Sequence, residues 1–142
     1  MNNKSKFVVK AELENLSKIA DFIMQNGLEL GLNDKGIFQL QLAADEVASN
    51  IILHGYAHKT GPIHLTIWKE NDKIILMIED RGEPFNPLTA GKPDLNSPLE
   101  ERSPGGLGIH FLKKLTDTVH YEFKNGKNRL TVAKALNQEK IE

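Results

Sequence analysis

Two polar side chains, Glu46 and Asn50, stand four residues apart in a segment with helical periodicity. Residues at this spacing project from the same face of a helix, so a carboxylate and an amide oxygen would be presented together. The pair is offset from the apolar stripe that contains Val47 and Ile51. Because an exposed helix surface without a ligand often carries such a pair, it indicates a site only together with other segments.

A second polar group occurs in Asp80-Arg81-Gly82, where an apolar strand gives way to a loop. A carboxylate at a strand end can accept a hydrogen bond from an amino group, such as the exocyclic amine of adenine. Gly82 would let a flat ring approach the backbone closely. An ordinary turn is the alternative interpretation, because Asp and Gly are both favoured in turns.

Glycines gather in a third segment, Gly105-Gly106-Leu107-Gly108, ahead of a short helical pattern. Backbone N–H groups at the start of a helix attract phosphate oxygens through hydrogen bonds and the helix dipole. A glycine-rich hinge without a ligand fits the same residues. The sequence contains no G-x-x-x-x-G-K-[ST] motif, so a P-loop is excluded as the means of holding phosphates.

Two amphipathic helices are expected in the first part of the chain. Apolar residues recur at helical spacing over residues 13–23, and Gly27 is expected to break this first helix. Asn33 is a candidate N-cap for the second helix, whose apolar stripe covers residues 37–51 and fades at Gly55. The second helix would therefore carry the polar pair.

The rest of the chain predicts strands around one long loop. Strands are expected at residues 7–10, 63–68, 73–80, 119–123 and 130–136, with a short helix at 109–115. Asn125-Gly126 predicts a two-residue hairpin turn. Residues 81–104 show no periodicity and contain five of the six prolines, which is typical of a lid or binding loop. Together these elements predict an α+β fold, a two-layer sandwich whose mixed, mostly antiparallel sheet has helices on one face.

The composition is that of an ordinary globular protein. With 142 residues, 39% hydrophobic and 26% charged, one domain is expected over residues 1–142, with its core at about 7–136. A net charge of -1 does not favour direct binding to nucleic acid or to a membrane surface. The absence of cysteine excludes disulfides and thiolate metal sites. The sequence shows no apolar segment typical of a signal peptide or of a membrane span, so a cytoplasmic location is expected.

The order and spacing of the three polar segments resemble the GHKL ATP-binding (Bergerat) fold. The matching motifs are Glu46-x-x-x-Asn50, Asp80-x-Gly82 and Gly106-x-Gly108. More narrowly, Asp80-Arg81-Gly82-Glu83-Pro84-Phe85 and Leu99-Glu100-Glu101-Arg102-Ser103 look like the anti-sigma factor serine/threonine-protein kinases. The resemblance covers about residues 7–136 and implies ATP and Mg²⁺ as cofactors, bound under a lid at about residues 81–104.

The resemblance also implies roles for residues at the matching positions. Glu46 would orient or deprotonate the attacking hydroxyl, and Asn50 would give its side-chain oxygen to Mg²⁺. One amide oxygen is adequate, because Mg²⁺ keeps several waters and takes few protein ligands beside substrate phosphates. Asp80 would bind the adenine amine, while Gly82 would give the base access to the backbone.

Further roles are implied for the lid. The Gly106-Leu107-Gly108 segment would cradle the phosphates, and Arg102 would stabilise the transferring group, although a solvated loop arginine looks the same in sequence. Pro84 stands where the wider GHKL pattern has a second glycine, and no further glycine follows Gly108 closely. Both departures fit the anti-sigma branch better than gyrase-type ATPases or histidine kinases.

The implied function is a serine/threonine kinase that phosphorylates an anti-anti-sigma (STAS-type) protein and can hold a sigma factor inactive. The alternative is an ATP-gated protein-binding module with little or no kinase activity. The catalytic domain of a histidine kinase is disfavoured, because no separate phosphoacceptor helix pair is offered. Similar proteins dimerise, and residues 7–10 would be an edge strand able to pair across a two-fold axis.

Two further features of the sequence admit a functional interpretation. His54 and His58 have the spacing of a helical zinc pair, but Gly55 intervenes and no third ligand is evident, so zinc is not expected. His54 is better explained as a helix-end residue that complements the dipole. Trp68 lies on the wetter side of its strand, where ordinary sheet packing is favoured over a partner surface.

Overall fold

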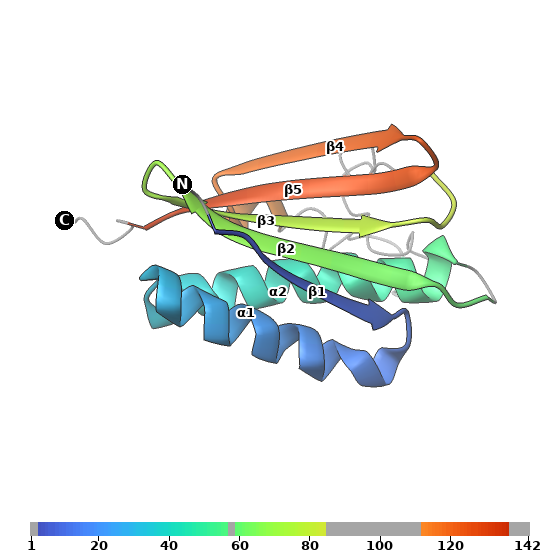
Figure 1. The fold of residues 1–142 in the computed structure, drawn as a ribbon, viewed down its shortest axis with the longest axis horizontal. Coiled ribbons are helices and arrows are strands. Elements are labelled where there is room, and N and C mark those ends of the chain that lie inside the picture. The colour runs from blue at the N-terminus through green and yellow to red at the C-terminus, as the bar shows by residue number, and fades with distance from the viewer. Residues whose placement is uncertain (1–2, 57–58, 85–111, 137–142) are drawn as a thin grey trace, which may run out of the picture.

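A computed structural model of the protein describes residues 3–56, 59–84 and 112–136, which form two layers (Figure 1). One layer is a five-stranded sheet in the order β1-β2-β3-β5-β4, and the other consists of two long helices on one face of that sheet. In chain order the elements are β1 (Ser5–Lys10), the 3₁₀ turn η1 (Leu13–Asn15), α1 (Leu16–Leu30), α2 (Asp34–Asn50), the π-helical turn η2 (Ile51–Gly55), β2 (Pro62–Glu70), β3 (Lys73–Asp80), β4 (Thr118–Lys124) and β5 (Lys127–Ala135). The expected α+β sandwich is confirmed, and every pairing between the described strands is antiparallel.

The break expected at Gly27 is wrong. Helix α1 continues to Leu30 and ends at Gly31, whose φ of 100° lies in the left-handed region that suits a glycine C-cap. Gly27 instead lies where the two helices meet, because a Cβ there would approach Ile37 Cγ1 to 3.0 Å. This glycine is a packing contact rather than a breaker. Neither α1 nor any other helix in the described ranges is long and apolar enough to cross a membrane.

Helix α2 begins as the sequence predicts. The Asn33 side chain accepts a 2.8 Å hydrogen bond from the Gly36 N–H, which satisfies one of the free donors at the helix start. The apolar stripe is buried against the sheet and includes Ile37, Leu40, Ala44, Val47 and Ala48. The helical path then runs through η2 to Gly55, where the stripe was expected to fade. Glu46 and Asn50 are half-buried on the flank of this helix.

Strand alternation places a charged residue at the end of the helix-facing side of β3. In β3 the buried face is made by Ile74, Leu76 and Ile78, and the next residue in this alternation is Asp80. Asp80 pairs with Ile63 of β2 on one side and Asn128 of β5 on the other. The apolar face of β3 therefore ends in a buried carboxylate.

The last two strands form the predicted hairpin. Asn125 and Gly126 have φ values of 56° and 77°, and Lys124 pairs with Lys127 across them. Positive φ at both central residues is the requirement of a type I′ turn, which suits the twist of a hairpin. The hairpin places β5 beside β3 and leaves β4 at the edge of the sheet.

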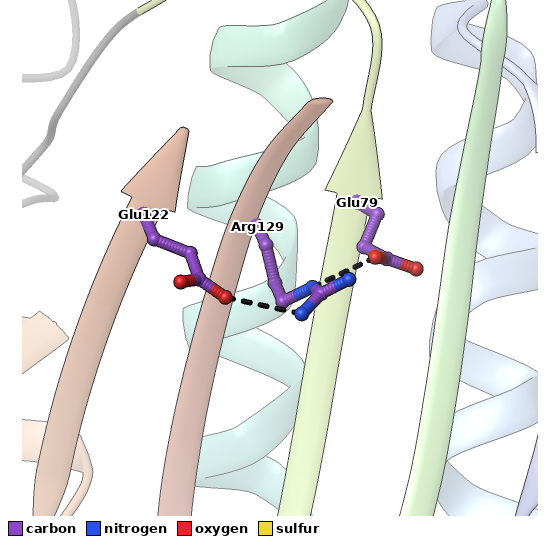
Figure 2. A network of polar contacts seen from close by, with 3 residues as sticks. All are labelled: Glu79, Glu122 and Arg129. Carbon is purple, nitrogen blue, oxygen red and sulfur yellow. Dashed lines mark hydrogen bonds and ion pairs between the residues drawn. The ribbon is translucent and has the colours of Figure 1, made fainter. Parts of the chain in front are cut away.

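The face of the sheet away from the helices carries a three-residue ion-pair network (Figure 2). Arg129 of β5 lies between Glu79 of β3 and Glu122 of β4, with N to O distances of 2.8 and 3.0 Å. The Arg129 side chain is 40% exposed, so each pair contributes about 0–1 kcal/mol. Trp68 lies on this face as well, where Lys4 packs over its ring and its side chain is only 8% exposed.

Candidate functional site

Glu46 and Asn50 contact each other directly on α2. The Asn50 Nδ2 group donates to the Glu46 carbonyl oxygen at 2.9 Å and to Glu46 Oε2 at 2.7 Å. Both amide hydrogens are thus directed at Glu46. None of the described residues donates a hydrogen bond to the Asn50 amide oxygen, so this oxygen is the group that a cation would use.

The environment makes the Glu46 carboxyl less acidic than an ordinary glutamate. Partial burial raises its pKa, and the nearby Asp45 charge raises it further. The hydrogen bond from Asn50 acts in the opposite direction but does not offset the burial. A carboxylate with a raised pKa binds a proton more readily, which is the property that a general base requires.

Asp80 is a buried acceptor with one oxygen already in use. Its side chain is 5% exposed, and its Oδ1 accepts hydrogen bonds from the Gly82 N–H at 2.7 Å and from Asn128 Nδ2 at 3.1 Å. Burial raises the pKa of Asp80, while these two hydrogen bonds lower it without cancelling the effect. No described residue donates to Oδ2, so this oxygen could accept a further hydrogen bond.

Gly82 fits tightly against the end of the helical segment. A Cβ at this position would lie 2.5 Å from the Gly55 carbonyl oxygen and 2.6 Å from its carbon, closer than any side chain tolerates. The neighbouring Glu83 N–H donates to the same carbonyl oxygen at 2.8 Å. The Asp80 turn is therefore docked against Gly55, and glycine at position 82 is a steric requirement.

Tyr56 makes a second link between the helical segment and this turn. Its hydroxyl donates to the Pro62 carbonyl oxygen at 2.8 Å and accepts from the Arg81 N–H at 2.8 Å. Gly55 is the last residue of the turn η2, which continues from Asn50, and Tyr56 directly follows it. Figure 1 shows the C-terminal ends of α2 and β3 at the same end of the two layers. The Asp80 turn therefore contacts the residues that continue the helix of Glu46 and Asn50.

Several predicted residues cannot be placed by the structure. Most of the expected lid, residues 85–104 with Arg102, lies outside the described residues. The predicted phosphate cradle, Gly106-Leu107-Gly108, and His58 also lie outside them. The other histidine, His54, is exposed within η2. The phosphate cradle and the role of the arginine stay predictions.

The sequence reasoning missed two polar residues of the site, Asn128 and Tyr121. Asn128 Nδ2 lies 3.2 Å from the Gly82 carbonyl oxygen and 3.0 Å from that of Glu83, besides its contact with Asp80. The Tyr121 hydroxyl donates to Asn128 Oδ1. The available signal was an asparagine in phase with the buried Leu130 and Val132 of its strand, because an unpaired polar group at such a position is costly.

Comparison with known proteins identifies a family of ATPase domains for this chain. The profile of the histidine kinase-like ATPase domain family matches residues 9–134. A serine/threonine-protein kinase of Bordetella bronchiseptica, BtrW, is 32% identical over 96 residues, which are 67% of this chain and 68% of that protein. The anti-sigma F factor of Clostridium kluyveri is 27% identical over 142 residues, covering 94% of both chains.

A solved structure shows the same fold. The structure of the RsbU and RsbW domains of a Mycobacterium tuberculosis protein superposes on this chain with a TM-score of 0.66 at 16% sequence identity. The match covers 94% of this chain and 32% of that longer chain. At this identity the likeness shows a shared fold, and the residues of the site are argued from the contacts above.

Proposed function

Since the chain belongs to the histidine kinase-like ATPase family, we propose that it is an ATP-dependent serine/threonine protein kinase whose substrate is an anti-anti-sigma protein of the STAS type. The observation that carries the proposal is the docking of the Asp80 turn on Gly55. This contact brings a buried acceptor to the helical segment that carries the Glu46 and Asn50 pair. Base recognition and phosphoryl chemistry are thereby served by one connected unit.

The residues present fit Mg-ATP. The Asn50 amide oxygen is the group that would hold Mg²⁺, and Asp80 Oδ2 is the acceptor that would bind the adenine amine. When bound, Mg-ATP supplies the transferable phosphoryl group and neutralises its charge. Glu46 Oε2 is engaged by Asn50, so Oε1 is the oxygen that would accept the proton of the substrate hydroxyl. Arg102 and the Gly106-Leu107-Gly108 segment are proposed to act on the phosphates.

The names of the relatives also support a regulatory role. One relative is a serine/threonine-protein kinase and another is an anti-sigma F factor. We therefore propose that this chain binds both an anti-anti-sigma protein and a sigma factor, and that it acts in the cytoplasm where transcription is controlled. The strand β1 forms one edge of the sheet, and we propose pairing along β1 for a homodimer.

Transfer to a cognate STAS-type protein tests the proposal. Wild type, Glu46→Gln and Asp80→Asn would each be incubated with ATP, Mg²⁺ and that protein, and phosphoserine or phosphothreonine would be measured by mass spectrometry. Wild type should transfer, Glu46→Gln should bind ATP without transfer, and Asp80→Asn should fail at binding. Tight ATP binding by wild type without any transfer would overturn the kinase proposal. Partner binding that depends on ATP and survives Glu46→Gln would then identify an ATP-gated binding module.

A further inference from the structure

We infer that Asn128 is a positioning residue for base recognition, and that Tyr121 sets its orientation. The inference rests on the proposed function, because it concerns how Asp80 is prepared to receive adenine. Asn128 is 7% exposed and sits opposite Asp80 in the β3–β5 pairing. Asn128 donates to the Asp80 carboxylate from β5, whereas the Gly82 N–H donates to it from the turn after β3.

The Asn128 amide holds the carboxylate and the turn at once. Its Nδ2 lies within hydrogen-bonding distance of Asp80 Oδ1, the Gly82 carbonyl oxygen and the Glu83 carbonyl oxygen, at 3.1, 3.2 and 3.0 Å. Two amide hydrogens thereby serve three acceptors. Because these acceptors come from both sides of the bend after β3, movement of the turn would break contacts with Asn128.

Tyr121 determines which end of the amide faces Asp80. Its hydroxyl donates to Asn128 Oδ1, and the two residues lie on neighbouring strands β4 and β5. An amide is nearly symmetric in shape, but the reversed orientation would bring Oδ1 against the three acceptors around Asp80. The Tyr121 bond and the Asp80 contact therefore favour the same orientation of Asn128.

The chemical consequence is a choice between two kinds of purine. With Oδ1 engaged by Asn128 and Gly82, Asp80 presents Oδ2 as a hydrogen-bond acceptor. An acceptor fixed in this way suits a 6-amino purine and repels the oxygen of a 6-oxo purine. Without Asn128, the carboxylate keeps only the Gly82 donor and is held less firmly, so the preference for a 6-amino over a 6-oxo purine should fall.

On the opposite face of the sheet, the neighbour of Asn128 in β5 makes two ion pairs. Arg129 follows Asn128 directly and contacts both Glu79 and Glu122 across the neighbouring strands (Figure 2). Successive residues of a strand point to opposite faces, so Arg129 lies away from the base-recognition side. Substitution of Arg129 is therefore the matched control, because it disturbs the same strand without touching the inferred contact.

The test is the ratio of affinities for ATP and inosine triphosphate, which carries an oxygen in place of the adenine amine. Both would be titrated calorimetrically, with Mg²⁺ at neutral pH, into wild type, Asn128→Ala, Tyr121→Phe and Arg129→Met. Wild type should prefer ATP. Asn128→Ala should reduce ATP affinity by about tenfold or more, as expected for a lost hydrogen bond to a charged group, and should lower the ratio. Tyr121→Phe should lower the ratio by less, and Arg129→Met should leave it unchanged.

Equal weakening of both nucleotides in Asn128→Ala, or no weakening, would overturn the inference, since a purely structural role predicts an unchanged ratio. If wild type binds neither nucleotide, the proposed function fails and the inference falls with it. Tyr121→Phe removes a single hydroxyl and keeps the test decisive if Asn128→Ala does not fold.

A conservative variant supplies an independent readout. Asn128→Asp should lower the preference for ATP over inosine triphosphate at neutral pH, because an aspartate cannot supply the two amide hydrogens that reach Asp80, Gly82 and Glu83. An unchanged preference in this variant would count against the inference.

Discussion

The backbone N–H of Glu83 donates a 2.8 Å hydrogen bond to the carbonyl oxygen of Gly55. Glu83 lies just after Asp80, the last residue of β3. Gly55 ends the helical segment that continues from the Glu46 and Asn50 pair. Segments almost thirty positions apart in the chain are joined here by the backbone, so their relative placement depends on few side chains. Substitutions that disturb this joint should affect both base binding and chemistry.

Gly82→Ala should disrupt the joint. The added Cβ would lie 2.5 Å from the Gly55 carbonyl oxygen, and because this neighbour is backbone, the turn must move away. Overpacking of this kind costs about 1–3 kcal/mol in the free energy of unfolding, and ATP affinity should fall with it. Urea unfolding and ATP titration would measure the two effects.

Gly55→Ala serves as the control for stability, since a Cβ at that position meets nothing nearer than 3.8 Å. Wild-type stability and ATP affinity in Gly82→Ala would contradict the steric argument.

Asp80→Asn should separate stability from binding. The amide oxygen can keep the hydrogen bonds from Gly82 and Asn128, but an NH₂ group replaces Oδ2 and would face the adenine amine donor to donor. ATP affinity should fall about tenfold or more. The free energy of unfolding at neutral pH should not fall, because a buried carboxylate has been replaced by a neutral group.

The pH dependence of this stability difference follows from the raised pKa of Asp80. The folded state binds the Asp80 proton more tightly than the unfolded state does, so wild-type stability decreases as pH rises from about the ordinary value of 3.8 to the raised folded value. Asp80→Asn lacks this carboxyl, so its free energy of unfolding does not decrease in this way. The difference in stability between the variant and wild type should therefore grow as pH rises through this range. Chemical unfolding at several pH values would measure it, and a shrinking advantage would contradict the assigned shift.

The rate of phosphoryl transfer should fall when the pH is lowered below the pKa of Glu46. Burial raises the pKa of this carboxyl above its ordinary value of 4.5, and only the deprotonated form can accept the hydroxyl proton. Single-turnover transfer at saturating Mg-ATP should therefore decline as pH is lowered through a value above 4.5. Saturation removes the contribution of Asp80 to binding. A rate that stays flat to pH 4.5 in the folded enzyme would contradict a base with a raised pKa at this position.

Asn50→Ala should remove the dependence of ATP binding on Mg²⁺. The variant loses the amide oxygen that we assign to the cation, and metal affinity typically falls on the order of tenfold or more when the ligand shell is damaged. Titrations with Mg²⁺ and with a chelator would be compared. Only the affinity measured with Mg²⁺ should drop.

Asn26→Ala is the matched control, because Asn26 Nδ2 also donates to a carbonyl oxygen four residues earlier, that of Phe22, at 2.9 Å. If Asn50→Ala keeps the full effect of Mg²⁺, another residue must hold the cation.

Local chemistry was sufficient to predict the elements. The Asn33 cap, the stripe of α2 and the Asn125-Gly126 turn depend on residues close together in sequence, and all three are observed. The wetter face expected for β2 is wrong at Trp68, which is buried. Gly27 was misread because glycine serves both to end a helix and to let a neighbour approach. Which of these applies is decided by Ile37, which lies on the next helix.

The site was predictable only in part for a related reason. Glu46 and Asn50 meet through helical spacing alone, so their contact followed from the sequence. The contact of Asn128 with Asp80 joins residues 48 positions apart, and it exists because β5 pairs with β3 rather than only with β4. No local pattern encodes that choice of partner, which depends on how the whole sheet is assembled.

The internal position of β5 has a consequence for the newly made chain. Ribosomal synthesis delivers the N-terminal helices and the strands β1 to β3 first, and the inner edge of β3 has no partner until β5 has emerged. Asp80 lacks the Asn128 donor throughout that interval. Under the inferred role of Asn128, selectivity for adenine would therefore arise only after β5 has paired with β3.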